Sequence, residues 1–196
     1  MEQNSVFPIQ VDNIVYVTDA ILKRLSDVEN HSYVMGVCKK KEDVISGKRI
    51  LMLDGVQDPG NLGTILRSSK AFDIDTVVLS MDTVDLYNPK VIRATQGMMF
   101  HMNVVRSDLI PVIKDLKERE VPIYATRVQF GEDVRNLKEK DKKTFALIMG
   151  NEGKGVSEEV MDLADKYIYI DMNHMVESLN VAIATSILLY ELKENE

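Results

Sequence analysis

Short β-branched runs alternate with helical stretches from about Ser46 to the end of the chain, and this alternation limits the fold more than any other feature. The order βαβα predicts an α/β fold, with a mostly parallel sheet and helices on both faces. Six segments are typical of strands: residues 49–55, 76–80, 100–105, 121–128, 144–150 and 166–172. Four segments between them predict helices: 61–72, 88–97, 107–120 and 157–165, with Asn61, Asn88, Ser107 and Ser157 as N-caps.

The last predicted helix, from about Ser178 to Lys193, is apolar nearly all round. Such a helix is buried on several sides. We expect it either to be wrapped by its own chain or to be covered by another subunit.

The first 46 residues are less regular. Residues 13–27 indicate a strand followed by a short helix, residues 32–40 another strand, and the charged residues 39–48 a linker. Pieces of this size bury little core alone. We therefore expect two domains: residues 1–46 as a small N-terminal α+β region with its linker, and residues 47–196 as the main domain.

Composition narrows the class of protein. With 45% hydrophobic and 28% charged residues, the 196-residue chain has the make-up of a soluble globular protein. No apolar stretch is long enough for a membrane span and the N-terminus lacks a signal pattern, which predicts a cytoplasmic protein. Cys38, His31, His101 and His174 are scattered without the spacing of a zinc site, so we expect no metal. A net charge of −7 restricts any nucleic-acid contact to local basic patches.

Three segments share one pattern: an apolar strand ends, a loop rich in Gly or Asn follows, and a helix begins. They are LDGVQDPGNLGTILRSS (53–69), IMGNEGKGVS (148–157) and IDMNHMVESLNVAIA (170–184). Ligands of parallel α/β sheets collect at the carboxyl ends of strands, so the three loops are expected to line one cleft. The second loop lacks the spacing of a Walker phosphate loop, and no G-x-G-x-x-G follows the first strand of the core.

From Lys48 to Leu192 the chain resembles the SpoU-type (TrmH-like) RNA ribose methyltransferases of the SPOUT class. The resemblance rests on DGVQDPGNLGTILRSS, YNPKVIRATQG, IMGNEGKGVS and MVESLNVAIATSILLYE, in the order of that family. The chain departs from the family at Asp171, where Pro is common, and at Thr95 and Ala182, where Ser is common. The resemblance implies a C-terminal trefoil knot and a homodimer that completes the site. Residues 1–46 look like the last part of the substrate-binding domain of longer relatives.

The activity that the resemblance implies is transfer of a methyl group from S-adenosylmethionine to a ribose 2'-hydroxyl in structured RNA, with rRNA favoured over tRNA. This reaction needs no metal. Two alternatives stay open: an RNA-binding or ribosome-assembly module with the same fold but no turnover, and a methyltransferase that acts on a base nitrogen.

The resemblance also implies the site residues. Arg67 is the expected catalytic arginine, acting either as the base or, because arginine normally stays charged, as a stabiliser of the developing alkoxide. Asn61, Glu152, Ser178 and Asn180 are expected to organise the site, although Asn61 and Ser178 also suit plain helix caps. The expected cofactor-binding residues, acting mostly through their main chain, are Ala125, Thr126, Gly150, Asn151, Gly153, Ile170, Met172, Ser178 and Leu179.

Overall fold

A computed structural model of the protein describes residues 13–26, 33–42, 44–128 and 130–193. The chain forms two compact units, Met1–Lys41 and Glu42–Glu196. In the first unit the described residues contain one helix, α1 (Asp19–Leu25). The second unit holds the sheet and the remaining helices.

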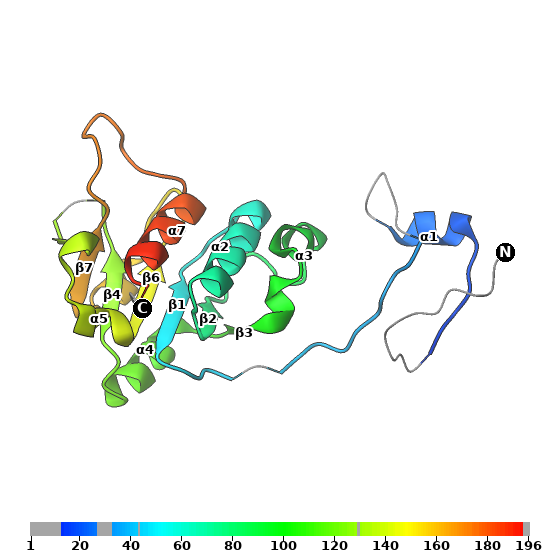
Figure 1. Ribbon diagram of the computed structural model, residues 1–196, viewed down its shortest axis with the longest axis horizontal. Coiled ribbons are helices and arrows are strands. Elements are labelled where there is room, and N and C mark those ends of the chain that lie inside the picture. Colours follow the sequence, from blue (N-terminus) through cyan, green and yellow to red (C-terminus); the bar gives the residue numbers. More distant parts are fainter. Residues whose placement is uncertain (1–12, 27–32, 43, 129, 194–196) are drawn as a thin grey trace. The chain divides into compact units, whose positions relative to one another are not determined.

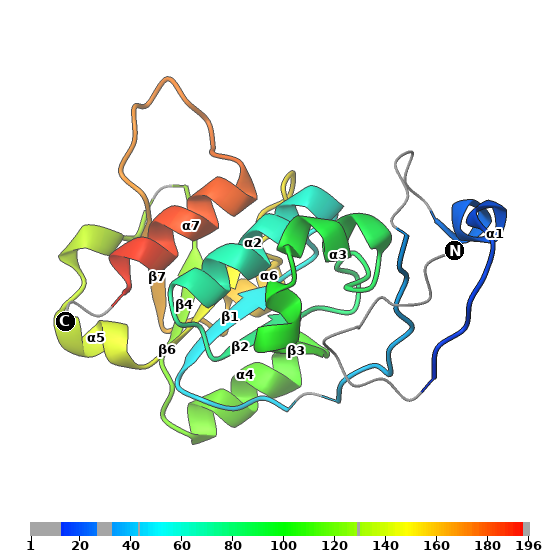
Figure 2. The same ribbon diagram turned by 45° about the vertical axis from the view of Figure 1, so that its right-hand side comes forward.

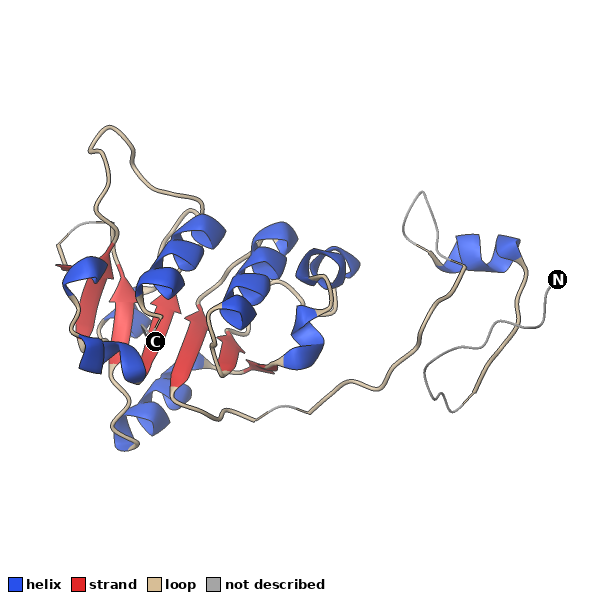
Figure 3. Ribbon diagram, viewed as in Figure 1, coloured by secondary structure: helices blue, strands red, loops and turns tan. Residues whose placement is uncertain are grey.

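The second unit is built on a seven-stranded sheet in which every strand pairing is parallel (Figure 3). The strand order is β3-β2-β1-β6-β4-β7-β5. The strands are β1 (Arg49–Leu53), β2 (Thr76–Leu79), β3 (Asn103–Arg106), β4 (Ile123–Thr126), β5 (Glu132–Asp133), β6 (Phe145–Met149) and β7 (Lys166–Tyr169). The predicted α/β class with a mostly parallel sheet is confirmed.

The central strands are buried on both faces, as continuous apolar runs in a parallel sheet require. Every residue of β1 and of β6 is buried. Successive side chains of β1 point to opposite faces, so Leu51 and Leu53 belong to one hydrophobic cluster, and Ile50 and Met52 to another. The sheet therefore separates two cores.

Helices cover both of these faces (Figures 1 and 2). The first core is closed by α2 (Pro59–Ala71), α3 (Pro89–Thr95) and α7 (Val181–Glu191). The second is closed by α4 (Leu109–Glu118) and α6 (Glu158–Met161). Shorter helical pieces are η1 (Met98–His101), η2 (Val134–Asn136) and α5 (Glu139–Lys143).

Helix α2 lies between α3 and α7 and contacts both closely. A Cβ atom added to Gly63 would lie 2.2 Å from Cβ of Ala94, so α2 and α3 cross where only glycine fits. On the α7 side, Ser68 Oγ lies 2.6 Å from Ser186 Oγ. These contacts fix the position of α2 against its two neighbouring helices.

Two of the predicted N-caps are wrong. Helix α2 begins earlier than expected, because Asp58 Oδ1 accepts from the N–H of Asn61 and Pro59 occupies the first turn. Asn61 is therefore the third residue of the helix rather than its cap. Asp108, not Ser107, caps α4 through the N–H of Ile110. Asn88 caps α3 as predicted, and Ser157 precedes α6 without a side-chain cap.

Other differences concern short or unpaired segments. The predicted strand 100–105 is half right, because η1 extends to His101 and β3 begins only at Asn103. Among the described residues of the first unit, neither predicted strand forms, and side chains such as Val37, 98% exposed, have nothing to pack on. The remainder of those predictions, in residues 27–32, lies outside the described residues, as does His31.

The loops after β1, β6, β4 and β7 lie together at the carboxyl ends of these strands, because the four strands are parallel neighbours in that order. The chain does not enclose helix α7 completely, since Ile183 and Tyr190 are 54% and 65% exposed. No helix in the described part of the chain has the length and hydropathy of a membrane span. The trefoil knot stays a prediction.

Candidate functional site

A chain of side-chain hydrogen bonds joins the three loops that the sequence predicted to meet. Asn61 Nδ2 donates to Glu152 Oε1 at 3.0 Å, and Asn180 Nδ2 donates to Asn61 Oδ1 at 3.0 Å. Asn61 comes from the first turn of α2, Glu152 from the loop after β6 and Asn180 from the start of α7. One amide side chain therefore links residues that lie far apart in the sequence.

Glu152 also holds the loop before α2. Its Oε2 accepts from the N–H of Gln57 and its Oε1 from the N–H of Asp58, both at 3.2 Å. Partial burial raises the pKa of Glu152, but the hydrogen bonds from Asn61 and from backbone N–H groups outweigh it and leave the pKa below its usual value. The carboxylate is therefore ionised near neutral pH and acts as an acceptor for its neighbours.

Asn180 is the N-cap of α7. Its Oδ1 accepts from the N–H of Ala182 at 2.9 Å and of Ile183 at 3.3 Å, while its Nδ2 reaches Asn61. The alternative reading of Ser178 as the plain cap of this helix is wrong, because Asn180 occupies the N-cap position. Ser178 is exposed and makes no hydrogen bond to another described residue.

The loop after β6 is a tight turn closed on itself. Asn151 and Gly155 exchange backbone hydrogen bonds of 2.9 Å, and Asn151 Oδ1 accepts from the N–H of Gly153 and of Lys154. A Cβ on Gly150 would lie 2.0 Å from the carbonyl carbon of Gly155, so only glycine permits this closure. Asn151 Nδ2 donates to the carbonyl of Gly55 at 2.7 Å, a second link to the loop after β1.

A cleft of about 400 Å³ opens beside this turn, between the ends of β4, β6 and β7 and the first turns of α7. Ala125 does not line it, because its side chain is fully buried in the second core. The predicted cofactor residues that do line it are Thr126, Gly150, Asn151, Gly153, Ile170, Met172, Ser178 and Leu179.

The cleft suits a nucleoside-sized ligand with both apolar and polar parts. Its volume falls within the range of about 300–1,000 Å³ that small-ligand sites occupy. Apolar side chains such as Ile168, Ile170 and Leu179 form its walls, and the glycine-rich turn brings main-chain polar groups to its rim. The charged side chains at the cleft include Arg127, whose guanidinium lies 4.2 Å from the ring centroid of Tyr167, and Lys154. S-adenosylmethionine fits this combination of size and polarity.

Several residues of the cleft wall were not predicted from the sequence. Val181, Ala184 and Leu188 reach it from α7, and their spacing of three and four residues places them on one face of that helix. The same spacing is expected of any core helix, so the sequence alone does not distinguish a cleft wall from a core. Val156 and Met161 complete the wall near α6.

Arg67 stands apart from this hydrogen-bond chain. It lies six residues after Asn61 on α2, so the two side chains point to different sides of the helix. Arg67 is exposed and has no hydrogen bond or ion pair with another described residue. Its guanidinium is consequently free to meet a ligand or a second chain.

Residues 48–190 match the family model described as the SpoU rRNA Methylase family. The chain belongs to this family. The match covers the whole sheet, the cleft and the three linked loops.

Proteins named as RNA methyltransferases resemble the chain in sequence and in structure. The 23S rRNA (guanosine(2553)-2'-O)-methyltransferase RlmP of Bacillus subtilis is 38% identical over 170 residues, which is 86% of this chain and 68% of that protein. A TrmH-family protein from Porphyromonas gingivalis superimposes with a TM-score of 0.77 and 32% identity, over 88% of this chain and 70% of that one.

A third relative was solved with its cofactor. The SpoU methyltransferase AviRb of Streptomyces viridochromogenes, in complex with AdoMet, has a TM-score of 0.69 and 27% identity over 76% of this chain and 60% of its own. The predicted SpoU-type family, RNA methyltransferase class, RNA substrate class and S-adenosylmethionine cofactor are confirmed at the level of the family. The chain spans between 60% and 70% of these relatives' lengths.

Among the described residues, no group of three His, Cys, Asp or Glu side chains is placed to hold a metal ion. His174 lies exposed in the loop between β7 and α7.

Proposed function

We propose that this SpoU-family chain transfers a methyl group from S-adenosylmethionine to a ribose 2'-hydroxyl of structured RNA, with rRNA favoured over tRNA. The observation that carries the proposal is the junction of three loops through Asn61, Glu152 and Asn180 at the rim of the cleft. RlmP, the relative with 38% identity, is named as an enzyme of this reaction on 23S rRNA. A cytoplasmic location follows from such a substrate.

The bound cofactor supplies an electrophilic methyl group on a sulfonium sulfur. The chain must align the acceptor hydroxyl and exclude water. The apolar walls, with Ile168, Ile170 and Leu179, exclude water. Glu152 and Asn61 help to align the acceptor hydroxyl by holding the loops around the cleft in one arrangement.

Arg67 is the residue that we propose acts on the RNA. It normally stays charged, so its proposed role is to orient an RNA phosphate and to stabilise negative charge on the ribose oxygen. Its lack of an ion-pair partner among the described residues supports this role, because no carboxylate competes with the RNA. Exposed Lys90 and Arg93 on α3 add positive charge to a chain whose net charge is −7.

We also propose that the chain acts as a homodimer and that its C-terminal segment forms the trefoil knot of the SPOUT class. Ile183 and Tyr190 are exposed on α7, and their separation of seven residues places them on one face. A second copy would remove this apolar surface from water. Sedimentation at several protein concentrations tests the dimer, and a monomer at all concentrations would contradict it.

The activity test combines labelled S-adenosylmethionine with total RNA from a strain that lacks the modification, followed by mapping of ribose methylation. We expect label on one ribose, and a loss of at least about a hundredfold in turnover for Arg67→Ala, since one charged stabiliser is worth about 10² or more in rate. Lys70→Ala is the matched control, because Lys70 is also an exposed cation of α2. It should keep wild-type turnover.

Three outcomes would contradict the proposal in different ways. Label on bases would support the alternative acceptor. Cofactor binding without transfer to any RNA would support the ribosome-assembly module. Unchanged turnover in Arg67→Ala would reject the role of that residue while leaving the reaction itself intact.

A further inference from the structure

The loop between β7 and α7 forms one wall of the cofactor cleft, yet it extends far from the body of the protein. Ile170 and Met172 line the cleft at its start, and Ser178 and Leu179 line it at its end. Between them the chain arches away from the sheet (Figures 1 and 2). Within this loop, Met175 is 91% exposed. Packing therefore contributes little to the position of this loop.

The loop has very few polar links to the rest of the unit. From Asp171 to Leu179, one side chain alone forms a hydrogen bond or ion pair with a described residue outside the segment: Asp171 Oδ2 accepts from Arg135 Nη2 at 2.9 Å. The other hydrogen bonds of the segment are internal, from the N–H groups of Met175 and Val176 to Asn173. Immediately after the segment, Asn180 is bound to Asn61. The loop is thus held at its two ends.

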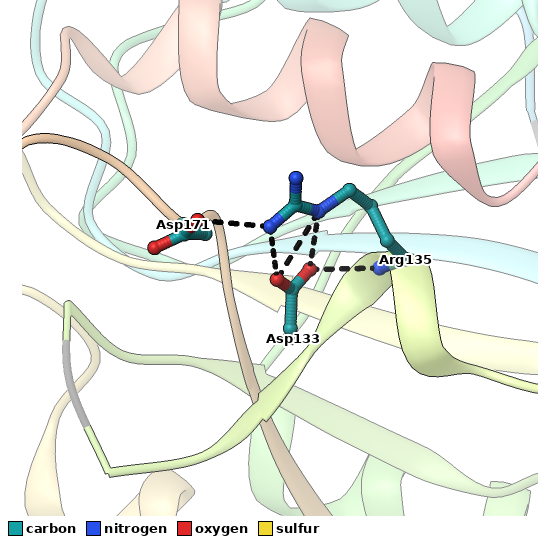
Figure 4. A network of polar contacts seen from close by, with 3 residues as sticks. All are labelled: Asp133, Arg135 and Asp171. Atoms are coloured by element: carbon teal, nitrogen blue, oxygen red, sulfur yellow. Dashed lines mark hydrogen bonds and ion pairs between the residues drawn. The ribbon is translucent and has the colours of Figure 1, made fainter.

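Arg135 is itself held firmly by Asp133 (Figure 4). Its Nε lies 3.1 Å from both carboxylate oxygens of Asp133, and its Nη2 lies 2.5 Å from Oδ2. The side chain of Asp133 is only 11% exposed, and its residue pairs with Tyr169 in the sheet. The hydrogen bond from Arg135 is the largest influence on Asp133 and holds the pKa of that carboxyl below its usual value. The guanidinium of Arg135, in η2, is therefore held in a fixed position beside the end of β5.

We propose that Arg135 and Asp171 are positioning residues of the cofactor site, an inference that rests on the proposed function. Their ion pair fixes the start of the β7–α7 loop, so that Ile170 and Met172 stay on the cleft wall. Neither charged group lines the cleft described above. They act on the cofactor only through the backbone between them and the wall.

The effect should appear in cofactor affinity rather than in global stability. Arg135 and Asp171 are 58% and 56% exposed, and exposed ion pairs add little to the stability of a fold. If the loop can take several positions, however, the apparent affinity for the cofactor falls in proportion to the fraction of molecules whose loop is in the binding position. An exposed pair at the strong end of the usual range, about 0.7–1 kcal/mol, corresponds to an increase of about threefold to fivefold in Kd when it is lost.

Asp171→Ala is the test variant, because it leaves the Arg135–Asp133 contact intact. Asp115→Ala is the matched control: Asp115 is 60% exposed and pairs with Arg119 on α4 at 3.4 Å, so the same charge is removed from a comparable pair. Titration calorimetry of the full chain with S-adenosylmethionine should give a Kd about threefold to fivefold higher for Asp171→Ala, and an unchanged Kd for Asp115→Ala.

Two further readouts separate positioning from general destabilisation. Arg135→Gln should raise the Kd at least as much as Asp171→Ala, because it removes this pair and the contacts with Asp133, and the double variant should raise the Kd no further than Arg135→Gln does. In turnover assays the KM for the cofactor should rise while kcat stays unchanged. The ratio between variant and wild-type Kd should shrink at high salt, where the pair is screened.

The possible failures are distinguishable. A wild-type chain that does not bind S-adenosylmethionine would overturn the proposed function and this inference together. A wild-type chain that binds, with Asp171→Ala binding equally well, would overturn the inference alone. Equal losses in Asp171→Ala and Asp115→Ala would also overturn it, since the cause would be net charge rather than loop position.

Discussion

Asn61→Asp is the substitution that tests the three-loop junction most directly, because it changes one amide nitrogen to oxygen and preserves the shape of the side chain. In the wild type, Asn61 Nδ2 donates to Glu152 Oε1 at 3.0 Å. In the variant, a second carboxylate oxygen faces Glu152 across the same gap. Asn180 can still donate to the other oxygen, so the change is confined to one contact.

The expected cost follows from the distance. Two unit charges 3.0 Å apart repel by about 1.4 kcal/mol in bulk water and about 5.5 kcal/mol at an effective dielectric constant of about 20. Glu152 is exposed, which places the repulsion near the lower value. The lost hydrogen bond adds about 1 kcal/mol, and a negative charge in the first turn of a helix recovers about 0.5 kcal/mol. We expect the free energy of unfolding to fall by about 2 kcal/mol near pH 7.5.

The pH dependence of this deficit identifies its cause. Two facing carboxyls raise each other's pKa in the folded variant, so the folded state binds more protons than the unfolded state above about pH 4. The stability of Asn61→Asp should therefore rise as the pH falls from about 7.5 to about 5. In the wild type the pKa of Glu152 is lowered, so its contribution is complete above the unfolded value of about 4.3 and is lost only below it. Between about pH 5 and about pH 7.5, Glu152 of the wild type therefore adds no pH dependence to the free energy of unfolding.

Urea unfolding of the wild type, Asn61→Asp and Asn61→Ala at about pH 5 and about pH 7.5 measures these differences. Asn61→Ala loses the hydrogen bond to Glu152, and the one from Asn180 as well, without adding charge, so its deficit should be equal at both pH values. A deficit of Asn61→Asp that does not change with pH would refute the argument. It would mean that Asn61 and Glu152 do not face each other in solution.

Two more substitutions test how the loops are supported. Gly63→Ala should destabilise the protein by about 2 kcal/mol in urea unfolding, because overpacking against Ala94, 2.2 Å from the added Cβ, outweighs the gain of about 1 kcal/mol in helix propensity. Adding Ala94→Gly should restore part of the lost stability. If it restores none, α2 and α3 do not cross at these two residues. Arg106→Ala should cost about 2–4 kcal/mol, since its guanidinium donates to four carbonyls between Ser80 and Val84. Arg106→Lys should regain less than half of this, as a single ammonium lacks the planar fork.

The architecture of the main unit could be predicted because its signals are local and repeated. Each apolar run long enough to be buried on both sides, such as Arg49–Leu53 and Phe145–Met149, became a central strand. The two-residue strand β5 and the helix α5 were missed because such short elements have no periodicity to detect. The order of the strands also depends on pairings between distant segments, which no local pattern contains.

Propensity alone misled in the first unit. Val15, Tyr16 and Val37 suit a strand, but none of the described residues around them forms a ladder, and a strand is stable only when paired. At the helix starts, the error was to choose Asn61 over Asp58. The proline that follows Asp58 was the local sign of an earlier start.

For the candidate site, the sequence indicated which loops converge but not how they are joined. Asn61 contacts Glu152 and Asn180, and the roles of these residues in organising the site and in catalysis stay predictions. The pairing of Asp171 with Arg135 has no local signal, because the two residues come from different loops. Asp171 was singled out only as a departure from the family pattern.

The position of β1 in the sheet has a consequence during synthesis. Once residues 49–106 have left the ribosome, β1, β2 and β3 are able to pair, but the other neighbour of β1, strand β6, begins only at Phe145. Until then the nascent chain presents an open edge made of Ile50, Leu51, Met52 and Leu53, all fully buried in the finished protein. Open apolar edges are templates for aggregation, and late, non-local pairing slows folding. A truncation before β6 would therefore yield an aggregating fragment rather than a smaller working domain.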